Sequence, residues 1–189
     1  MAKMLIGGEH VDSVSRETYE VRNPATGEVV DAVPKGTARD VEHAIDAAQE
    51  AFKEWGDTTP EERGKLLMNG CELIRQKSDE IARVLTLEQG KTLFESQLEI
   101  HHLLHGLEFY AGLISKVRGA HVPLPQKGAY GMVIKQPIGV CGGIVPWNFP
   151  LTLMGTNGSR VRESTLRGCP RARASSRSAV WARSARTCR

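Results

Sequence analysis

The sequence predicts an α/β fold, and three observations support this prediction. Short extended segments bounded by turn residues stand near the N-terminus. Residues 37–116 repeat their apolar side chains at helical spacing. An apolar run then occupies residues 138–145, and such runs are typical of strands buried on both faces of a sheet. The order strands, helices, strand therefore indicates a mixed domain.

The N-terminal segment is expected to contain strands at residues 4–6, 18–22 and 28–33. The run NPATGE at residues 23–28 separates the second strand from the third. Asn, Pro and Gly at this spacing are typical of a turn between two strands. We therefore expect a β-hairpin here.

The first helix is predicted to begin after Thr37, which is placed to cap it. A second helix is predicted to begin at Thr59, because a cap is followed by proline at the first helical position and by two acids. The apolar faces of these helices are expected to carry Val41, Ile45, Ala48 and Phe52 in the first, and Leu66, Leu67, Ile74, Ile81, Val84 and Leu85 in the second.

The second helical stretch is expected to break near Ser78 and to end at Gly90. A further helix is expected from about Thr92 to Lys116, with Leu103, Leu104, Leu107, Tyr110, Ala111 and Ile114 facing inward. From Val122 the chain turns extended, and alternation over residues 130–136 predicts a strand.

Length and composition place the chain among globular proteins. With 189 residues, 40% of them hydrophobic, it is long enough for a domain with a sizeable core. No run of 18 apolar residues is present, so no membrane span is expected, and the N-terminal apolar stretch is too short for a secretory signal. The four cysteines form no CxxC pair, which favours a reduced, cytoplasmic setting.

The charge divides the chain at residue 157. Residues 158–189 carry nine Arg, no Lys and one acid, whereas residues 1–157 carry 16 Lys and Arg against 21 Asp and Glu. The segment 158–189 is rich in Arg, Ser and Ala and has few aliphatic residues and no strand or helix periodicity. It cannot bury enough apolar surface to offset its ordering entropy, so we expect a disordered tail.

Three interpretations of this tail remain open. It could be a basic arm that binds nucleic acid, a low-complexity linker, or an out-of-frame translation of GC-rich coding sequence. We favour the third, because Lys vanishes at an abrupt compositional break. Nucleic acid is therefore not an expected partner.

The motif PWNFP at residues 146–150 directly follows the apolar run 138–145. It resembles the turn after the first strand of the nucleotide-binding domain in NAD(P)-dependent aldehyde dehydrogenases. NPATGE at 23–28, EQGK at 88–91 and FYAG at 109–112 also match family-typical positions, so the resemblance covers about residues 5–156.

The resemblance implies an aldehyde-dehydrogenase-like fold. Residues 1–157 would be the N-terminal part of a Rossmann-type nucleotide-binding domain with preceding helices. Residues 122–136 would contribute to a separate oligomerisation sheet, because the intact family forms homo-oligomers. No GxGxxG fingerprint is present, and the family lacks it as well.

The resemblance also implies a site for a small aldehyde and for NAD or NADP. Asn148 matches the family's oxyanion donor, whereas its alternative role is to support a turn. Phe149 matches a wall of the aldehyde tunnel, or else it is a core aromatic residue. The positions that match the cofactor cleft are Ile144, Val145, Pro146, Trp147 and Asn148.

Other side chains are poorer candidates for chemistry. Cys141 is expected to be buried and inert within a strand, and Cys169 lacks the family's nucleophile motif. His101, His102 and His105 have helical spacing but no further ligand partner, so we expect a partly exposed helix face and no metal.

The resemblance places the family's catalytic cysteine, its glutamate and its cofactor-binding lysine beyond Asn157. The chain is therefore expected to be a truncated, inactive fragment of an aldehyde dehydrogenase. The alternative is a binding or regulatory module, which would pair with a full-length subunit or bind nucleic acid through the basic tail.

Overall fold

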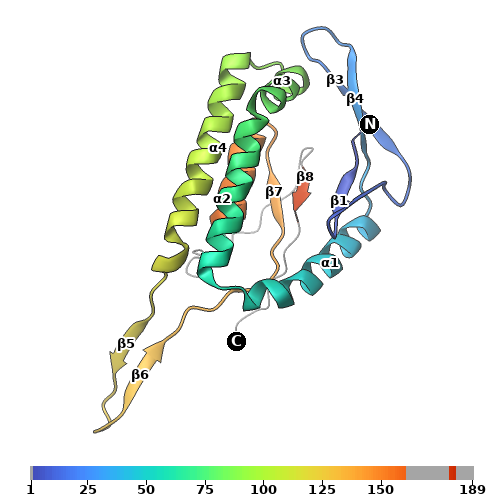
Figure 1. The fold of residues 1–189 in the computed structure, drawn as a ribbon. Coiled ribbons are helices and arrows are strands. Elements are labelled where there is room, and N and C mark those ends of the chain that lie inside the picture. The colour runs from blue at the N-terminus through green and yellow to red at the C-terminus, as the bar shows by residue number, and fades with distance from the viewer. Residues whose placement is uncertain (1, 161–178, 182–189) are drawn as a thin grey trace.

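The computed structural model describes residues 2–160 and 179–181, and helix α4 (Leu93–Leu113) lies along one side of it (Figure 1). This helix packs against α2 (Pro60–Gln76), α3 (Ser78–Gln89) and α5 (Pro150–Arg160). The least exposed apolar side chains of these helices are Cys71, Ala82, Leu85, Ile100 and Leu103. The core therefore lies where α2, α3 and α5 cover α4.

Three helices begin with a reciprocal capping box, in which a threonine and an acid three residues later bond each other's backbone N–H. These starts precede α1 (Ala38–Asp57), α2 and α4, and the threonines are Thr37, Thr59 and Thr92. The predictions that Thr37 and Thr59 begin helices are confirmed.

The helix ends also follow the sequence. The expected break near Ser78 separates α2 from α3, and α3 ends at Gly90, whose φ of 74° is left-handed. Helix α4 gives way to the short 3₁₀ helix η1 (Ile114–Lys116), at the predicted C-terminal limit of this helical stretch. Three side chains expected on apolar faces are exposed instead, namely Val41, Leu66 and Val84.

The N-terminal segment forms two antiparallel hairpins, β1 (Met4–Ile6) with β2 (Glu9–Val11), and β3 (Thr18–Arg22) with β4 (Val29–Pro34). Strand β2 was not predicted. The turn between β3 and β4 is closed by bonds from the Asn23 N–H to the Glu28 carbonyl and from the Gly27 N–H to the Asn23 carbonyl. The predicted hairpin is therefore confirmed.

A third hairpin, β5 (Ala120–Pro123) with β6 (Tyr130–Val133), extends away from the helices (Figure 1). It carries exposed apolar side chains, including those of Tyr130, Met132 and Ile134. The extended segments expected here are present. Their role in an oligomer remains a prediction.

The apolar run 138–145 differs from its prediction. Only β7 (Gly143–Val145) is a strand, and Ile138 and Ile144 are exposed, although Val140 and Val145 are buried. In the described residues, β7 pairs with β8 (Ala179–Trp181) and no second strand lies at its other edge. The prediction of a strand buried on both faces is therefore wrong for this chain.

The tail 158–189 lies mostly outside the described residues. Helix α5 continues across position 157 to Arg160, and β8 is a strand where disorder was expected, because β7 offers it an antiparallel partner. Among the described residues, no helix is long and apolar enough to cross a bilayer.

Candidate functional site

The turn between β7 and α5, at residues 146–149, presents a row of exposed side chains. Trp147 is 69% exposed and Phe149 51%, and Asn148 between them is exposed as well. Ile144, on the adjoining strand, is also exposed, whereas the side chain of Val145 is buried. The turn therefore offers one amide flanked by two aromatic rings.

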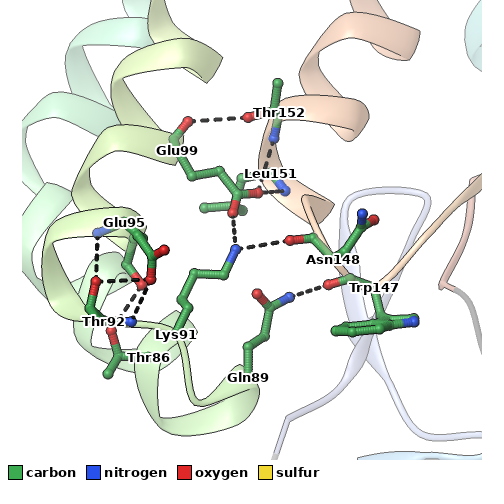
Figure 2. Close-up of polar contacts among 11 residues, drawn as sticks. Thr86, Gln89, Lys91, Thr92, Glu95, Glu99, Trp147, Asn148, Leu151 and Thr152 are labelled. Carbon is green, nitrogen blue, oxygen red and sulfur yellow. Dashed lines mark hydrogen bonds and ion pairs between the residues drawn. The ribbon is translucent and has the colours of Figure 1, made fainter.

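Two side chains hold the backbone of this turn, one from the last residue of α3 and one from the segment that follows it (Figure 2). Gln89 donates from Nε2 to the carbonyl of Trp147. Lys91 donates from Nζ to the carbonyl of Asn148 at 3.0 Å. Gly90 lies between them in the left-handed conformation, which ends α3 and turns the chain toward Lys91.

Glu99, on α4, is the fully buried partner of Lys91. Its Oε2 accepts a hydrogen bond from Lys91 Nζ at 2.5 Å. Its Oε1 accepts from the backbone N–H of Leu151 at 2.8 Å and from that of Thr152 at 3.4 Å. The two oxygens of one carboxylate thus bind the ammonium group and the first turn of α5.

The surroundings of Glu99 compensate its buried charge. Burying a carboxylate is costly unless it is paired and hydrogen-bonded. Lys91 supplies the opposite charge, and the N-terminus of α5 supplies unpaired N–H groups and the positive end of a helix dipole. Lys91 Nζ also lies 4.9 Å from the centre of the Phe149 ring, within cation–π range.

The side-chain amide of Asn148 lies on the far side of its backbone from Lys91 in Figure 2. The carbonyl of the residue is therefore bonded inward while its amide is exposed. A neutral amide carries two N–H donors and does not titrate, so it can donate to an oxygen on which negative charge develops.

The predicted cofactor positions differ in what they can contribute. Ile144 in β7 and Trp147, two residues after the strand ends, expose apolar side chains. Val145 is buried, so only its backbone can contact a ligand. Pro146 is exposed.

The remaining candidates do not join this site. Cys141 precedes β7 and is half-buried, with its Sγ 3.6 Å from the carbonyl of Gly139, so its predicted place within a strand is wrong. Cys169 lies outside the described residues. His101, His102 and His105 are exposed on α4, and no cluster of potential metal ligands forms in the described part of the chain.

Sequence reasoning missed Glu99. It identified residues 88–91 by resemblance but gave Gln89 and Lys91 no role. One signal was available, because Glu99 lies in the stripe that includes Ser96, Ile100 and Leu103, all of which are buried. An acid on a buried helix face needs a partner, so its position predicts a cation or N–H groups opposite it.

Residues 10–159 match the model of the aldehyde dehydrogenase family. The chain belongs to this family.

Two curated relatives are semialdehyde dehydrogenases. The chain is 38% identical over 151 residues to malonate-semialdehyde dehydrogenase of Bacillus pumilus, covering 80% of this chain and 31% of the relative. It is 40% identical over 150 residues to the NADP(+) succinate-semialdehyde dehydrogenase of Escherichia coli, covering 79% and 31%. The chain thus spans about a third of the length of the relatives it matches.

Solved structures give the same picture. An NADP-dependent enzyme of E. coli superposes with a TM-score of 0.82 at 38% identity, over 84% of this chain and 33% of that one. A betaine aldehyde dehydrogenase of Staphylococcus aureus, in complex with NAD+, superposes with a TM-score of 0.73 at 28% identity, over 85% and 33%. The predicted family and its mixed helix and strand fold are confirmed.

Proposed function

We propose that residues 1–157 contribute to the active site of an enzyme that oxidises an aldehyde to a carboxylic acid with NAD(P)+ and water. In this site Asn148 is the oxyanion donor. The observation that carries the proposal is the exposed amide of Asn148, on a turn whose backbone is bonded to Gln89 and Lys91.

The chemistry requires such a donor. When a thiolate adds to an aldehyde carbon, the carbonyl oxygen gains negative charge, and an N–H placed beside it lowers the barrier. Removing one donor of this kind typically costs about 3 kcal/mol of transition-state stabilisation. Asn148 supplies the N–H, and its backbone bond to Lys91 limits its movement.

NAD or NADP, when bound, accepts the hydride that leaves the aldehyde carbon. We assign its cleft wall to Ile144, Pro146 and Trp147, to the backbone of Val145, and to Asn148 at the end of the wall. The NADP and NAD+ in the names of the related proteins support this cofactor class, and both remain candidates.

The proposed substrate is a small aldehyde, and the names of the relatives favour a semialdehyde. Phe149 would form part of the aldehyde tunnel, since its ring is half exposed beside Asn148. A cytoplasmic homo-oligomer is the expected setting. The family match does not favour the alternative of a binding or regulatory module.

We further propose that the 189-residue chain does not oxidise aldehydes by itself, because none of its cysteines stands in the family's nucleophile motif. Incubation with succinate semialdehyde and NAD+ or NADP+ should therefore give no NAD(P)H. Turnover that disappears on cysteine alkylation would contradict this and would point to Cys169.

The oxyanion role is testable in a full-length chimera. Residues 1–156 of this chain would replace the matching segment of the E. coli succinate-semialdehyde dehydrogenase. Asn148→Ala should slow the pre-steady-state burst of NADPH by about a hundredfold or more, equivalent to about 2–4 kcal/mol. Cofactor affinity, measured by titration, should change far less.

Asn69→Ala is the matched control, because Asn69 is exposed on α2, a helix that does not form the turn. It should leave the burst rate unchanged. An unchanged burst in Asn148→Ala, or a collapse of cofactor binding with normal chemistry on the bound complex, would show that Asn148 is only a turn residue.

A further inference from the structure

We propose that Glu99 and Lys91 are positioning residues for Asn148, with Glu99 acting on the turn through Lys91. The inference rests on the proposed function for what Asn148 does. The hydrogen bonds that support it are present in the structure and do not depend on the reaction assigned to Asn148. They lie in a chain of bonds that runs from α4 to the turn (Figure 2).

The first step in the chain is electrostatic. A carboxylate and a backbone carbonyl are both acceptors, so Glu99 cannot bond the carbonyl of Asn148 directly. Lys91 lies between them and donates to both, at 2.5 Å to Glu99 and 3.0 Å to Asn148. Its side chain is only 15% exposed, so the carboxylate fixes where the ammonium points.

The second step fixes the other side of the turn. Oε1 of Glu99 accepts from Leu151 and Thr152, in the first turn of α5, which starts two residues after Asn148. A further bond, from Thr152 Oγ1 to the Glu99 carbonyl at 3.4 Å, ties the same turn to α4. One buried side chain thus fixes the carbonyl of Asn148 and the helix that follows it.

Glu99 itself is not placed to react. Its side chain is 0% exposed and both oxygens accept hydrogen bonds, so it offers no oxygen to water or to an aldehyde. A buried pair of charges is weak evidence for stability, because apolar residues of similar size often stabilise a core equally well. Fixing the geometry of the turn is the function that accounts for both partners.

The test uses the 189-residue chain and nuclear magnetic resonance, without substrate or cofactor. Two measurements are made, namely hydrogen exchange of the Leu151 amide and the relaxation of the Asn148 side-chain amide. Glu99→Gln should speed Leu151 exchange by about tenfold or more, because the acceptor loses its charge and one of its two accepting oxygens becomes an NH2 group. It should also increase the mobility of Asn148.

Lys91 variants separate the two steps. Lys91→Met should loosen Asn148 while Leu151 stays protected, because Glu99 still binds α5. Lys91→Arg should restore much of the order of Asn148, since it retains a donor and the charge. Adding Glu99→Gln to Lys91→Met should change the mobility of Asn148 less than Glu99→Gln does in the parent chain, because only the contact of Glu99 with α5 then remains to be lost.

Glu108→Gln is the matched control, since it removes another α4 carboxylate, the partner of Arg75 on α2. It should leave both measurements unchanged. If Glu99→Gln does not fold, Lys91→Met and Lys91→Arg alone test the proposal. Equal mobility of Asn148 in the parent chain and in Lys91→Met, or full additivity in the double variant, would overturn the proposal.

The chimera supplies a second readout. Lys91→Met should lower kcat by about tenfold or more while KM and cofactor affinity change little, because orientation in the transition state is lost. If Asn148→Ala has no effect in the chimera but Lys91→Met still frees Asn148 in the isolated chain, the proposed function fails and the positioning stands. If instead Asn148→Ala slows the chimera but Lys91→Met leaves Asn148 as ordered as in the parent chain, the positioning role fails and the proposed function stands.

Discussion

Two buried carboxylates, Asp40 and Glu99, are bound in different ways. Asp40 is 4% exposed and Glu99 1%. Each donor from the described residues that reaches Asp40 is neutral: Thr37 N–H at 2.7 Å and hydroxyl at 2.8 Å, Val14 N–H at 3.0 Å, and Ser13 hydroxyl at 3.1 Å. Glu99 accepts from helix N–H groups and from a lysine.

The difference follows from what each carboxylate connects. Asp40 joins the segment at Ser13 and Val14 to the start of α1, and both sides offer donors. Glu99 connects α4 to a carbonyl, which is an acceptor, so a donor must stand between them. At Glu99 this donor is the ammonium group of Lys91, whereas Asp40 contacts both of its partners directly.

The charge state of Asp40 shows that neutral donors suffice. Burial by itself raises the pKa of this carboxyl, but the hydrogen bonds from Thr37, Val14 and Ser13 together lower the pKa to about 2. Bonds to the charged form favour ionisation. Asp40 therefore stays ionised without an ion pair.

The largest loss of stability is expected when the buried carboxylate of Glu99 is removed. Glu99→Ala leaves Lys91 without its buried partner and the first turn of α5 without an acceptor, so stability should fall by about 3–5 kcal/mol. Asp40→Ala should cost less, because it strands no cation. Urea unfolding of both variants measures the two losses, and equal losses would contradict the distinction.

The next largest effect is a loss of folding stability at low pH through Asp40. The folded pKa of Asp40 lies below its ordinary value of 3.8, so its contribution to stability is complete above about pH 4 and is lost as the pH falls toward 2. Asp40→Asn should lack this component. Urea unfolding at several pH values tests it, and parallel pH profiles for both proteins would show that the bonds to Asp40 do not favour its charged form.

A smaller loss of stability is expected at Gly90, the left-handed residue that ends α3 beside Lys91. Gly90→Ala places a Cβ 2.6 Å from Cγ of Pro24 and forces a left-handed φ of 74° on alanine. The backbone strain alone should cost about 1–2 kcal/mol. Gly56→Ala, with no atom near the added Cβ, is the control in a thermal melt. Equal melting temperatures would show that the Gly90 turn adapts freely.

The smallest effect compares two helix caps. Thr37→Ala should destabilise the chain by about 1 kcal/mol, the usual cost of losing an N-cap. Thr59→Ala should cost less, because Thr59 and Glu62 are exposed to water whereas Thr37 also donates to buried Asp40. Chemical unfolding measures both, and a larger loss at Thr59 would reverse the ranking.

Sequence alone predicted features with nearby partners. Thr37 was identifiable because a capping residue directly precedes helical periodicity, and Thr59 because proline and two acids follow it. Gly90 was identifiable because glycine commonly ends a helix. The apolar run 138–145 was misjudged, because its burial depends on neighbouring strands that composition does not reveal.

The candidate site was predicted only in part. Resemblance identified the turn at Asn148, and the structure places its amide at the surface. Glu99 escaped notice because two of its donors, the backbone N–H groups of Leu151 and Thr152, belong to residues more than fifty positions further along the chain. Helix periodicity identifies apolar faces but does not say which charged residue on such a face has a distant partner.

The long sequence separation at Glu99 also sets an order of events during synthesis. Leu151 follows Glu99 by 52 residues, whereas Asp40 follows Ser13 by 27. At about 5–20 residues per second, a ribosome needs roughly 3–10 seconds to make those 52 residues. Asp40 thus meets partners already made, while Glu99 and Lys91 have only each other until α5 emerges. The turn that carries Asn148 is therefore fixed late in the synthesis of the chain.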